Sequence, residues 1–166
     1  MIRRFLFYPA VAAALLLVHF LIVPHLALAH IVPDVILVFV TYLAVREGRL
    51  TATIAGFVLG LVLDLTGGES SVLGLSALAK SVSGFLAGLF YGESEGRIFQ
   101  TLGSYRFSVI VMGASFVHNI IYFLIYLQGT DISFGDAIFL YAVPGALYCA
   151  LLSLLPMFFF SRRYSG

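Results

Sequence analysis

The sequence predicts an all-α, polytopic membrane protein, a bundle of six transmembrane helices forming a single domain over residues 1–166. The first reason is composition, because 61% of the residues are hydrophobic and only 10% are charged. Soluble domains have about 45–50% apolar and about 25% charged residues. The second reason is that the apolar residues form six long runs, and the third is that the arginines fall between alternate runs. Such a chain cannot cover a water-facing surface, which excludes a soluble enzyme and a disordered tail.

The apolar runs match the length of membrane-crossing helices, which need about 20 residues for about 30 Å of hydrocarbon. Pro24 follows the first run, Pro33 and Asp34 lie near the start of the second, and Pro144 and Pro156 lie inside the sixth. The second and third runs are near the lower limit of length. The expected spans are residues 5–23, 31–45, 50–65, 72–91, 107–127 and 136–160.

The distribution of basic residues predicts the orientation of these spans. Segments 1–4, 46–49, 92–106 and 161–166 contain eight of the nine basic residues: Arg3, Arg4, Arg46, Arg49, Arg97, Arg106, Arg162 and Arg163. Positively charged loops stay in the cytoplasm, so both termini are expected there. The N-terminal region also fits a cleavable secretory signal ending near Ala29. Its apolar run of about 19 residues is longer than the usual signal core of about 7–15, which favours a retained span.

Glycines recur at a spacing of four in two neighbouring spans. Small residues at this spacing allow helices to approach closely in a membrane. We expect them to pack against helices of the same chain, with a partner's helix as the alternative. One set is Gly56 and Gly60, followed at the same spacing by Asp64, and the other is Gly84, Gly88 and Gly92, preceded by Lys80.

Lys80 is the one basic residue inside a predicted span. An ionisable side chain near the centre of a span costs about 2.5–3.5 kcal/mol and is therefore usually paired or functional. The candidate partners are Asp64 and Asp34, either of which would close the outer side of the bundle. The alternative is that each charge reaches the membrane interface separately.

His118 and Asn119 lie near the middle of the fifth span. Intramembrane polar groups of this kind serve as proton relays or ligand contacts, or as interhelical hydrogen bonds. We favour hydrogen bonds for both residues, and for His19 in the first span.

The sequence has no features of an enzyme or of a cofactor site. It lacks a phosphate-binding glycine loop and the HExxH metal motif. Ser115 and His118 share one helix without an identifiable oxyanion site. Cys149 is the only cysteine, which excludes a disulfide framework and a cysteine-rich metal site. The scattered basic residues give no footprint for nucleic acid. We therefore expect no catalytic, cofactor-binding or metal-binding residues.

An ordered series of short motifs runs through residues 33–92. It reads PD, Y, REG, GFxxGLxxD and LGLxAL, and its residues include Pro33, Asp34, Tyr42, Gly48, Gly56, Gly60, Asp64, Leu73 and Gly74. This series resembles MreD, the family of small inner-membrane, rod shape-determining proteins of bacteria. Outside these residues the resemblance covers length, number of spans and arginine-flanked termini.

The resemblance implies a non-enzymatic role in the cell-wall elongation complex. A protein of this family would hold MreC and help couple MreB filaments to peptidoglycan synthesis by RodA and the elongation penicillin-binding protein. It would reside in the bacterial inner membrane, in contact with lipid. The residues to which the resemblance extends are Pro33, Asp34, Gly56, Gly60, Asp64, Leu73 and Gly74; Lys80 and His118 are singled out on physical grounds alone.

The alternative is a substrate-binding subunit of a vitamin transporter, of the S-component type. These subunits have a similar six-helix architecture, which the MreD family resembles. Ala10 and Ala14 are similar to the small-residue patch by which S-components contact their coupling partner. The polar residues expected on the outer side, which would line an outward pocket, are Asp34, Asp64, Glu69, Ser70 and Ser71.

Overall fold

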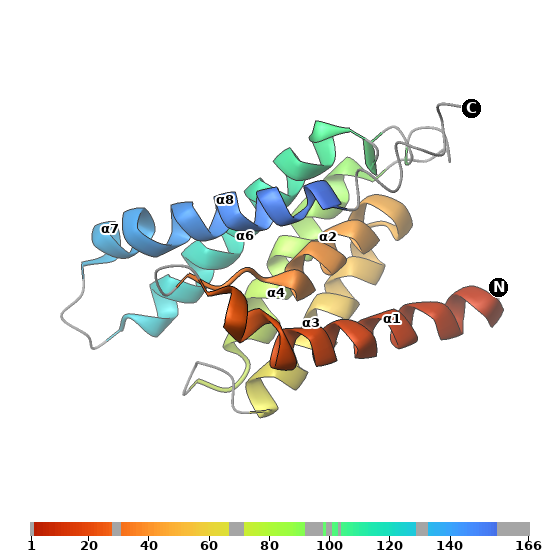
Figure 1. Ribbon diagram of the computed structural model, residues 1–166, viewed down its shortest axis with the longest axis horizontal. Helices are drawn as coiled ribbons and strands as arrows, with labels where there is room; N and C mark the ends of the chain where they lie inside the picture. The colour runs from red at the N-terminus through yellow and green to blue at the C-terminus, as the bar shows by residue number, and fades with distance from the viewer. Residues whose placement is uncertain are drawn as a thin grey trace.

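The computed structural model is all-helical in the part of the chain that it describes, which confirms that the protein is all-α (Figure 1). The described residues are 2–27, 31–66, 72–91, 98, 101–102, 104–128 and 133–155. Every predicted span contains a helix. The main helices are α1 (Ile2–Leu21), α2 (Val35–Glu47), α3 (Arg49–Leu65), α4 (Leu75–Ala87), α6 (Tyr105–Tyr126), α7 (Phe134–Ala137) and α8 (Val143–Leu152).

Three shorter helical segments in the described part of the chain adjoin these helices. The 3₁₀ turn η1 (Val23–Leu26) follows α1, and η2 (Gly88–Phe90) extends α4. The π-helical turn η3 (Ile138–Ala142) joins α7 to α8 in one continuous helix. Pro144 follows this turn, and because proline has no N–H, it interrupts the regular hydrogen-bond ladder. A wider turn accommodates such an interruption. Pro156 lies outside the described residues.

Among the described residues, two helices are long and apolar enough to cross a membrane, namely α6 and the continuous helix Phe134–Leu152. Shorter apolar helices cover Phe7–Leu21 and Leu75–Phe90. The second predicted span is shorter than expected, because α2 begins at Val35 rather than at residue 31. At 1.5 Å per residue, its 13 residues extend over about 20 Å.

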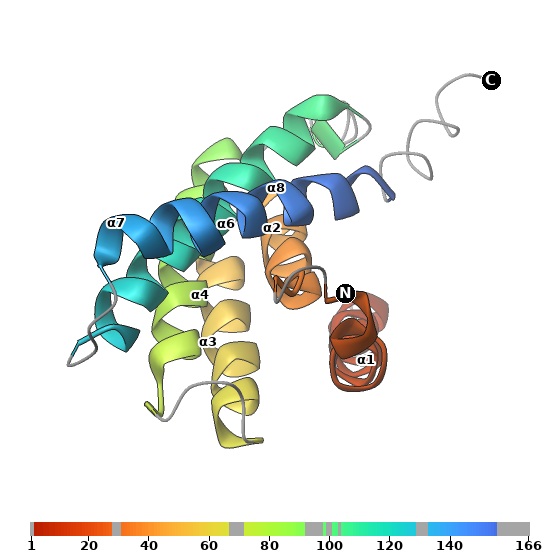
Figure 2. The same ribbon diagram turned by 60° about the vertical axis from the view of Figure 1, so that its left-hand side comes forward.

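Helix α2 is central in the fold (Figure 2). It contacts α1, α3, α4, α6 and α8. Its sequence is apolar on all sides, as is typical of a helix surrounded by other helices. Ile36, Leu37, Val40, Ala44 and Val45 have no exposed surface. The core of the protein therefore surrounds α2.

Two glycines in the left-handed region fix the ends of helices. Gly48 has φ of 91° and is the single residue between α2 and α3. Gly74 has φ of 90° and immediately precedes α4. Residues with a Cβ rarely adopt such backbone angles. The fourth predicted span therefore begins its helix at Leu75, not at Val72, and Lys80 lies in its second turn.

The surface of the bundle carries many large apolar side chains. Leu50 on α3 is 75% exposed and Phe139 in η3 is 76% exposed. On α3, the exposed side chains Leu50, Ile54, Phe57 and Val58 contrast with the buried Gly56, Leu59 and Gly60. Contiguous apolar surface of this kind is rare on soluble monomers.

Consecutive helices run in opposite directions, so that their ends gather at two ends of the bundle. Helix α1 begins and α8 ends on the right-hand side of Figure 1, where α2 meets α3 at Gly48. The other end contains the starts of α2 and α4 and the end of α3. In the orientation predicted from the arginines, this second end faces outward.

Candidate functional site

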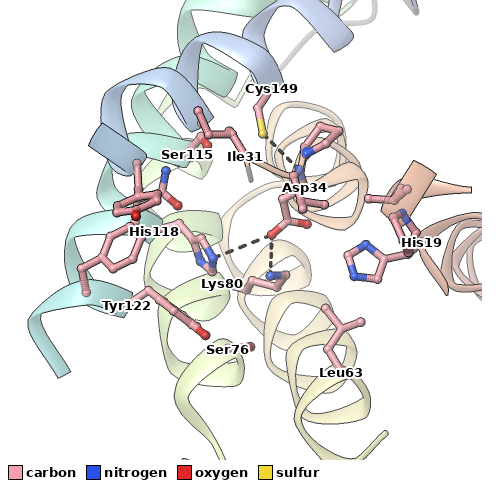
Figure 3. A pocket seen from close by; sticks show the side chains of 18 of the residues that line it. His19, Ile31, Asp34, Leu63, Ser76, Lys80, Ser115, His118, Tyr122 and Cys149 are labelled. Carbon is pink, nitrogen blue, oxygen red and sulfur yellow. Dashed lines mark hydrogen bonds and ion pairs between the residues drawn. The ribbon is translucent and has the colours of Figure 1, made fainter. Parts of the chain in front are cut away.

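Three ionisable side chains from separate elements meet at the predicted outer end (Figure 3). Asp34 precedes α2, Lys80 lies on α4 and His118 lies on α6. The Nζ atom of Lys80 donates to Asp34 Oδ2 at 2.5 Å. The Nε2 atom of His118 lies 3.7 Å from the same oxygen, which is longer than a hydrogen bond. We refer to Asp34, Lys80 and His118 as the charged cluster.

Asp34 has a second function in the same place. Its Oδ1 atom accepts a hydrogen bond from Leu37 N at 2.9 Å and thereby caps α2. Its own N–H donates to Cys149 Sγ on α8 at 3.2 Å. Both carboxylate oxygens are therefore engaged, one by the helix that follows and one by Lys80.

The charged cluster is largely removed from solvent. Lys80 is 3% exposed and His118 is 7% exposed, and the Asp34 side chain is 17% exposed. A buried charge is costly unless it is paired, so the ion pair is needed to keep Lys80 inside the bundle. Of the two pairs that the sequence leaves open, the structure contains Asp34–Lys80, and Lys80 does not reach out to an interface.

Asp64 caps α4 instead of pairing with Lys80. Its two carboxylate oxygens accept from Ser76 N and Ala77 N, each at 3.2 Å. Helix α4 needs this cap because Gly74, the residue before its first turn, has no side chain with which to bind the free N–H groups. Asp64 thus joins the end of α3 to the start of α4.

The glycine sets face each other across the α3–α4 contact. A Cβ atom at Gly56 would lie 2.6 Å from Lys80 O, and one at Gly60 would lie 2.5 Å from Ala77 Cα. From the other helix, a Cβ atom at Gly84 would lie 2.9 Å from Ala52 O. One at Gly88 would lie 2.6 Å from Arg49 Cα. The two helices pack backbone to backbone within this chain. Gly92 lies outside the described residues.

A cavity of about 470 Å³ adjoins the charged cluster. Residues from α1, η1, α3, α4, α6, η3, α8 and the segment before α2 line it. Figure 3 shows His19 and Leu63 facing the charged cluster across it. Its polar lining residues include Asp34, Lys80, Ser115, His118 and Asn119, and its apolar ones include Phe20, Ile31, Leu63 and Phe123.

Asn119 and His118 differ in their contacts, although they are adjacent. Asn119 Nδ2 donates to Ala142 O in the π-helical turn at 3.0 Å. This is the interhelical hydrogen bond that the sequence analysis favours. His118 faces Asp34 without a hydrogen bond to it. Its Nδ1 atom is buried and has no hydrogen-bond partner among the described residues.

The remaining motif residues have unequal surroundings. Pro33 is fully buried beside the cavity, whereas Leu73 is 67% exposed. Glu69, Ser70 and Ser71 lie outside the described residues.

Cys149 and Leu63 are at the site although the sequence did not predict them there, because neither has a pattern that would set it apart from core residues. Within the described residues, no group of three His, Cys, Asp or Glu side chains could hold a metal ion.

Comparisons of the chain with protein-family models, with curated proteins and with solved structures gave no significant match. Its function is therefore argued from its own residues and their geometry.

Proposed function

We propose that the chain is an MreD-like, non-enzymatic component of the bacterial cell-wall elongation complex, placed in the inner membrane by six spans with both termini in the cytoplasm. It would hold the membrane anchor of MreC and help couple MreB filaments to peptidoglycan synthesis by RodA and the elongation penicillin-binding protein.

One observation carries this proposal: six residues of the motif series each have a defined structural role in α2, α3 and α4. Asp34 caps α2 and pairs with Lys80, and Asp64 caps α4. Gly56 and Gly60 allow the close contact of α3 with α4, while Gly74 has the positive φ before α4. Pro33 is buried beside them. Such interdependent positions support a family motif over a chance series of common membrane residues.

The surface and the helix directions support the membrane part of the proposal. The exposed apolar side chains of α3 and η3 suit contact with lipid tails. Arg46 and Arg49 lie where α2 meets α3, at the end opposite the charged cluster. Basic residues on one side of a bundle indicate the cytoplasmic side.

Contacts near the cytoplasmic end would fix the position of α1. Tyr8 Oη on α1 donates to Glu47 Oε1 at the end of α2. A bundle whose outer surface carries many apolar side chains presents its helix faces as contact surfaces. Holding the anchor helix of a partner is a role that such faces can perform.

Affinity capture of the tagged protein from native membranes, followed by mass spectrometry, tests the proposal. An unrelated multi-pass protein with the same tag, expressed to the same level, is the control. We expect enrichment of MreC and the elongation synthases over this control. Absence of MreC from the captured fraction, when MreC is abundant in the input membranes, would contradict the scaffold role. Recovery of an energy-coupling membrane protein with its ATPases would favour the transporter alternative.

Depletion in rod-shaped host cells tests the role independently of capture. Because the proposed complex directs elongation, cells that lose the protein should become round. Rods of unchanged width after depletion verified by immunoblot would count against a role in wall elongation.

A further inference from the structure

The cavity beside the charged cluster is too large to be a packing defect. Protein interiors are close-packed, with few voids larger than a water molecule. At about 470 Å³, the cavity is within the range of about 300–1,000 Å³ that is typical of sites for small organic ligands. Segments from nearly the whole length of the chain contribute to its wall, so the cavity is a property of the whole bundle.

The wall of this cavity carries a buried ammonium group that can donate further hydrogen bonds. The Lys80 ammonium has three N–H groups, and one of them donates to Asp34 Oδ2. Both carboxylate oxygens of Asp34 are already engaged. His118 Nε2 lies 3.7 Å from Asp34 Oδ2 and makes no hydrogen bond to it. The hydrogen bond to Asp34 thus uses one of the three N–H groups of Lys80, and an incoming anionic group would supply an acceptor for the others.

We propose that this cavity binds the oxyanion group, a phosphate or a carboxylate, of an amphipathic ligand. Lys80 and His118 would donate to the oxyanion, and its apolar part would lie against Phe20, Leu63 and Phe123. A charged group provides the strong hydrogen bonds that compensate for burial. The ligand is either a lipid headgroup that enters from the membrane or a soluble organic acid that enters from the outer side.

Charge balance gives the proposal a second, independent consequence. Asp34 and Lys80 cancel each other, so a bound anion leaves one uncompensated negative charge in a buried site. Protonation of His118 removes this imbalance, because the cluster and its ligand then hold two positive and two negative charges. For an anion with a single negative charge, binding should therefore be accompanied by uptake of a proton and should strengthen as the pH falls. The titratable groups facing His118 in the cavity are Asp34, Lys80, His19, Tyr122, Tyr141 and Cys149.

The test uses the full chain in nanodiscs of phosphatidylcholine. Hexyl phosphate is the soluble probe, inorganic phosphate is the probe without an apolar part, and phosphatidylglycerol in the nanodisc is the lipid probe. Binding is followed by the shift of the thermal unfolding midpoint and by the NMR signals of ¹⁵N-labelled histidine. The chain has four histidines, and the His118→Gln variant identifies the signal of His118.

We expect saturable stabilisation by hexyl phosphate or by phosphatidylglycerol, with little effect of inorganic phosphate and with a shifted His118 signal. A response to phosphatidylglycerol alone identifies a lipid headgroup, and a response to hexyl phosphate alone identifies a soluble ligand. His118→Gln keeps the Asp34–Lys80 pair, and it should weaken binding at least about ten-fold, equivalent to about 1.4 kcal/mol, and abolish its pH dependence.

The double variant Asp34→Asn, Lys80→Met removes both charges and should abolish binding. Its asparagine side chain can still cap α2. Ser81→Ala is the matched control, because Ser81 also lies on α4 but bonds only to Ala77 O of its own helix. Absence of stabilisation by all probes at millimolar concentration would overturn the proposal, as would equal binding by the wild type and the double variant. Neither result bears on the wall-elongation role, which is tested by capture and depletion.

Discussion

The contact of α3 with α4 at Gly60 gives the sharpest test of the packing, through the single change Gly60→Ala. The added Cβ atom would lie 2.5 Å from Ala77 Cα and 2.6 Å from Ala77 N. Carbon atoms in favourable contact are about 3.5–4.0 Å apart. Because the obstructing atoms are backbone, no rotamer change relieves the overlap, and α3 must move away from α4.

The size of the effect follows from what this movement disturbs. Overpacking costs about 1–3 kcal/mol. Asp64 lies one turn beyond Gly60 and binds Ser76 N and Ala77 N at 3.2 Å, so separation of the helices also weakens this cap, at about 1 kcal/mol. Alanine gains about 1 kcal/mol over glycine in a helix interior. The net loss expected for Gly60→Ala is therefore about 1–3 kcal/mol.

Gly113→Ala is the matched control, because a Cβ atom at Gly113 on α6 would meet no atom within 4 Å. It should be neutral or stabilising by up to about 1 kcal/mol. The assay is unfolding of the purified protein from mild detergent by titration with dodecyl sulfate, followed by far-UV circular dichroism, since the chain contains no tryptophan. If Gly60→Ala and Gly113→Ala unfold at the same midpoint, the backbone contact of α3 with α4 is not as close as described.

Two further predictions concern the cap of α4 and the cysteine. Asp64→Ala should destabilise the protein by about 0.5–2 kcal/mol and speed hydrogen exchange at the amides of Ser76 and Ala77. Asp64→Asn has one acceptor oxygen in place of two, so it should restore only part of the protection. Unchanged exchange in Asp64→Ala would show that the cap is not formed. Cys149 is 2% exposed, so its alkylation by N-ethylmaleimide should be at least about ten-fold slower in the folded protein than in dodecyl sulfate. Equal rates would place the thiol on the surface.

The helices of this protein could be predicted because their signals are local. Each apolar run contains a helix, and the glycines at a spacing of four lie between α3 and α4. The run at 72–91 was less informative about where its helix begins. That boundary depends on the positive φ of Gly74, and a glycine in an apolar run does not by itself indicate a left-handed turn.

The composition of the site could be predicted only in part, because it depends on which helix ends meet. Asp34 and Asp64 are equally plausible partners of Lys80 in the sequence. The choice depends on the start of α4 at Leu75, which places the first-turn amides of Ser76 and Ala77 against Asp64 and leaves Lys80 facing Asp34. Of the residues expected to line an outward pocket, Asp34 lines the cavity and Asp64 does not. The rest of its wall could not be predicted, because the cavity is space left between elements that are distant in the chain.

The double function of Asp34 determines how its pair with Lys80 can be tested. Exchanging the two residues would not restore stability, even though the pair is formed. A lysine at position 34 cannot accept the hydrogen bond from Leu37 N, and its charge would oppose the dipole at the start of α2. A failed exchange would therefore say nothing against the pair.

A double-mutant cycle with Asp34→Asn and Lys80→Met separates the two functions, because asparagine can still cap α2. Each single change leaves one buried charge without its partner and should cost about 3–5 kcal/mol. The double variant has no buried charge, so it should lose at least about 2 kcal/mol less than the sum of the single changes. Additive losses, measured by the same dodecyl sulfate titration, would mean that Asp34 and Lys80 do not stabilise each other. The burial of Lys80 would then need another explanation.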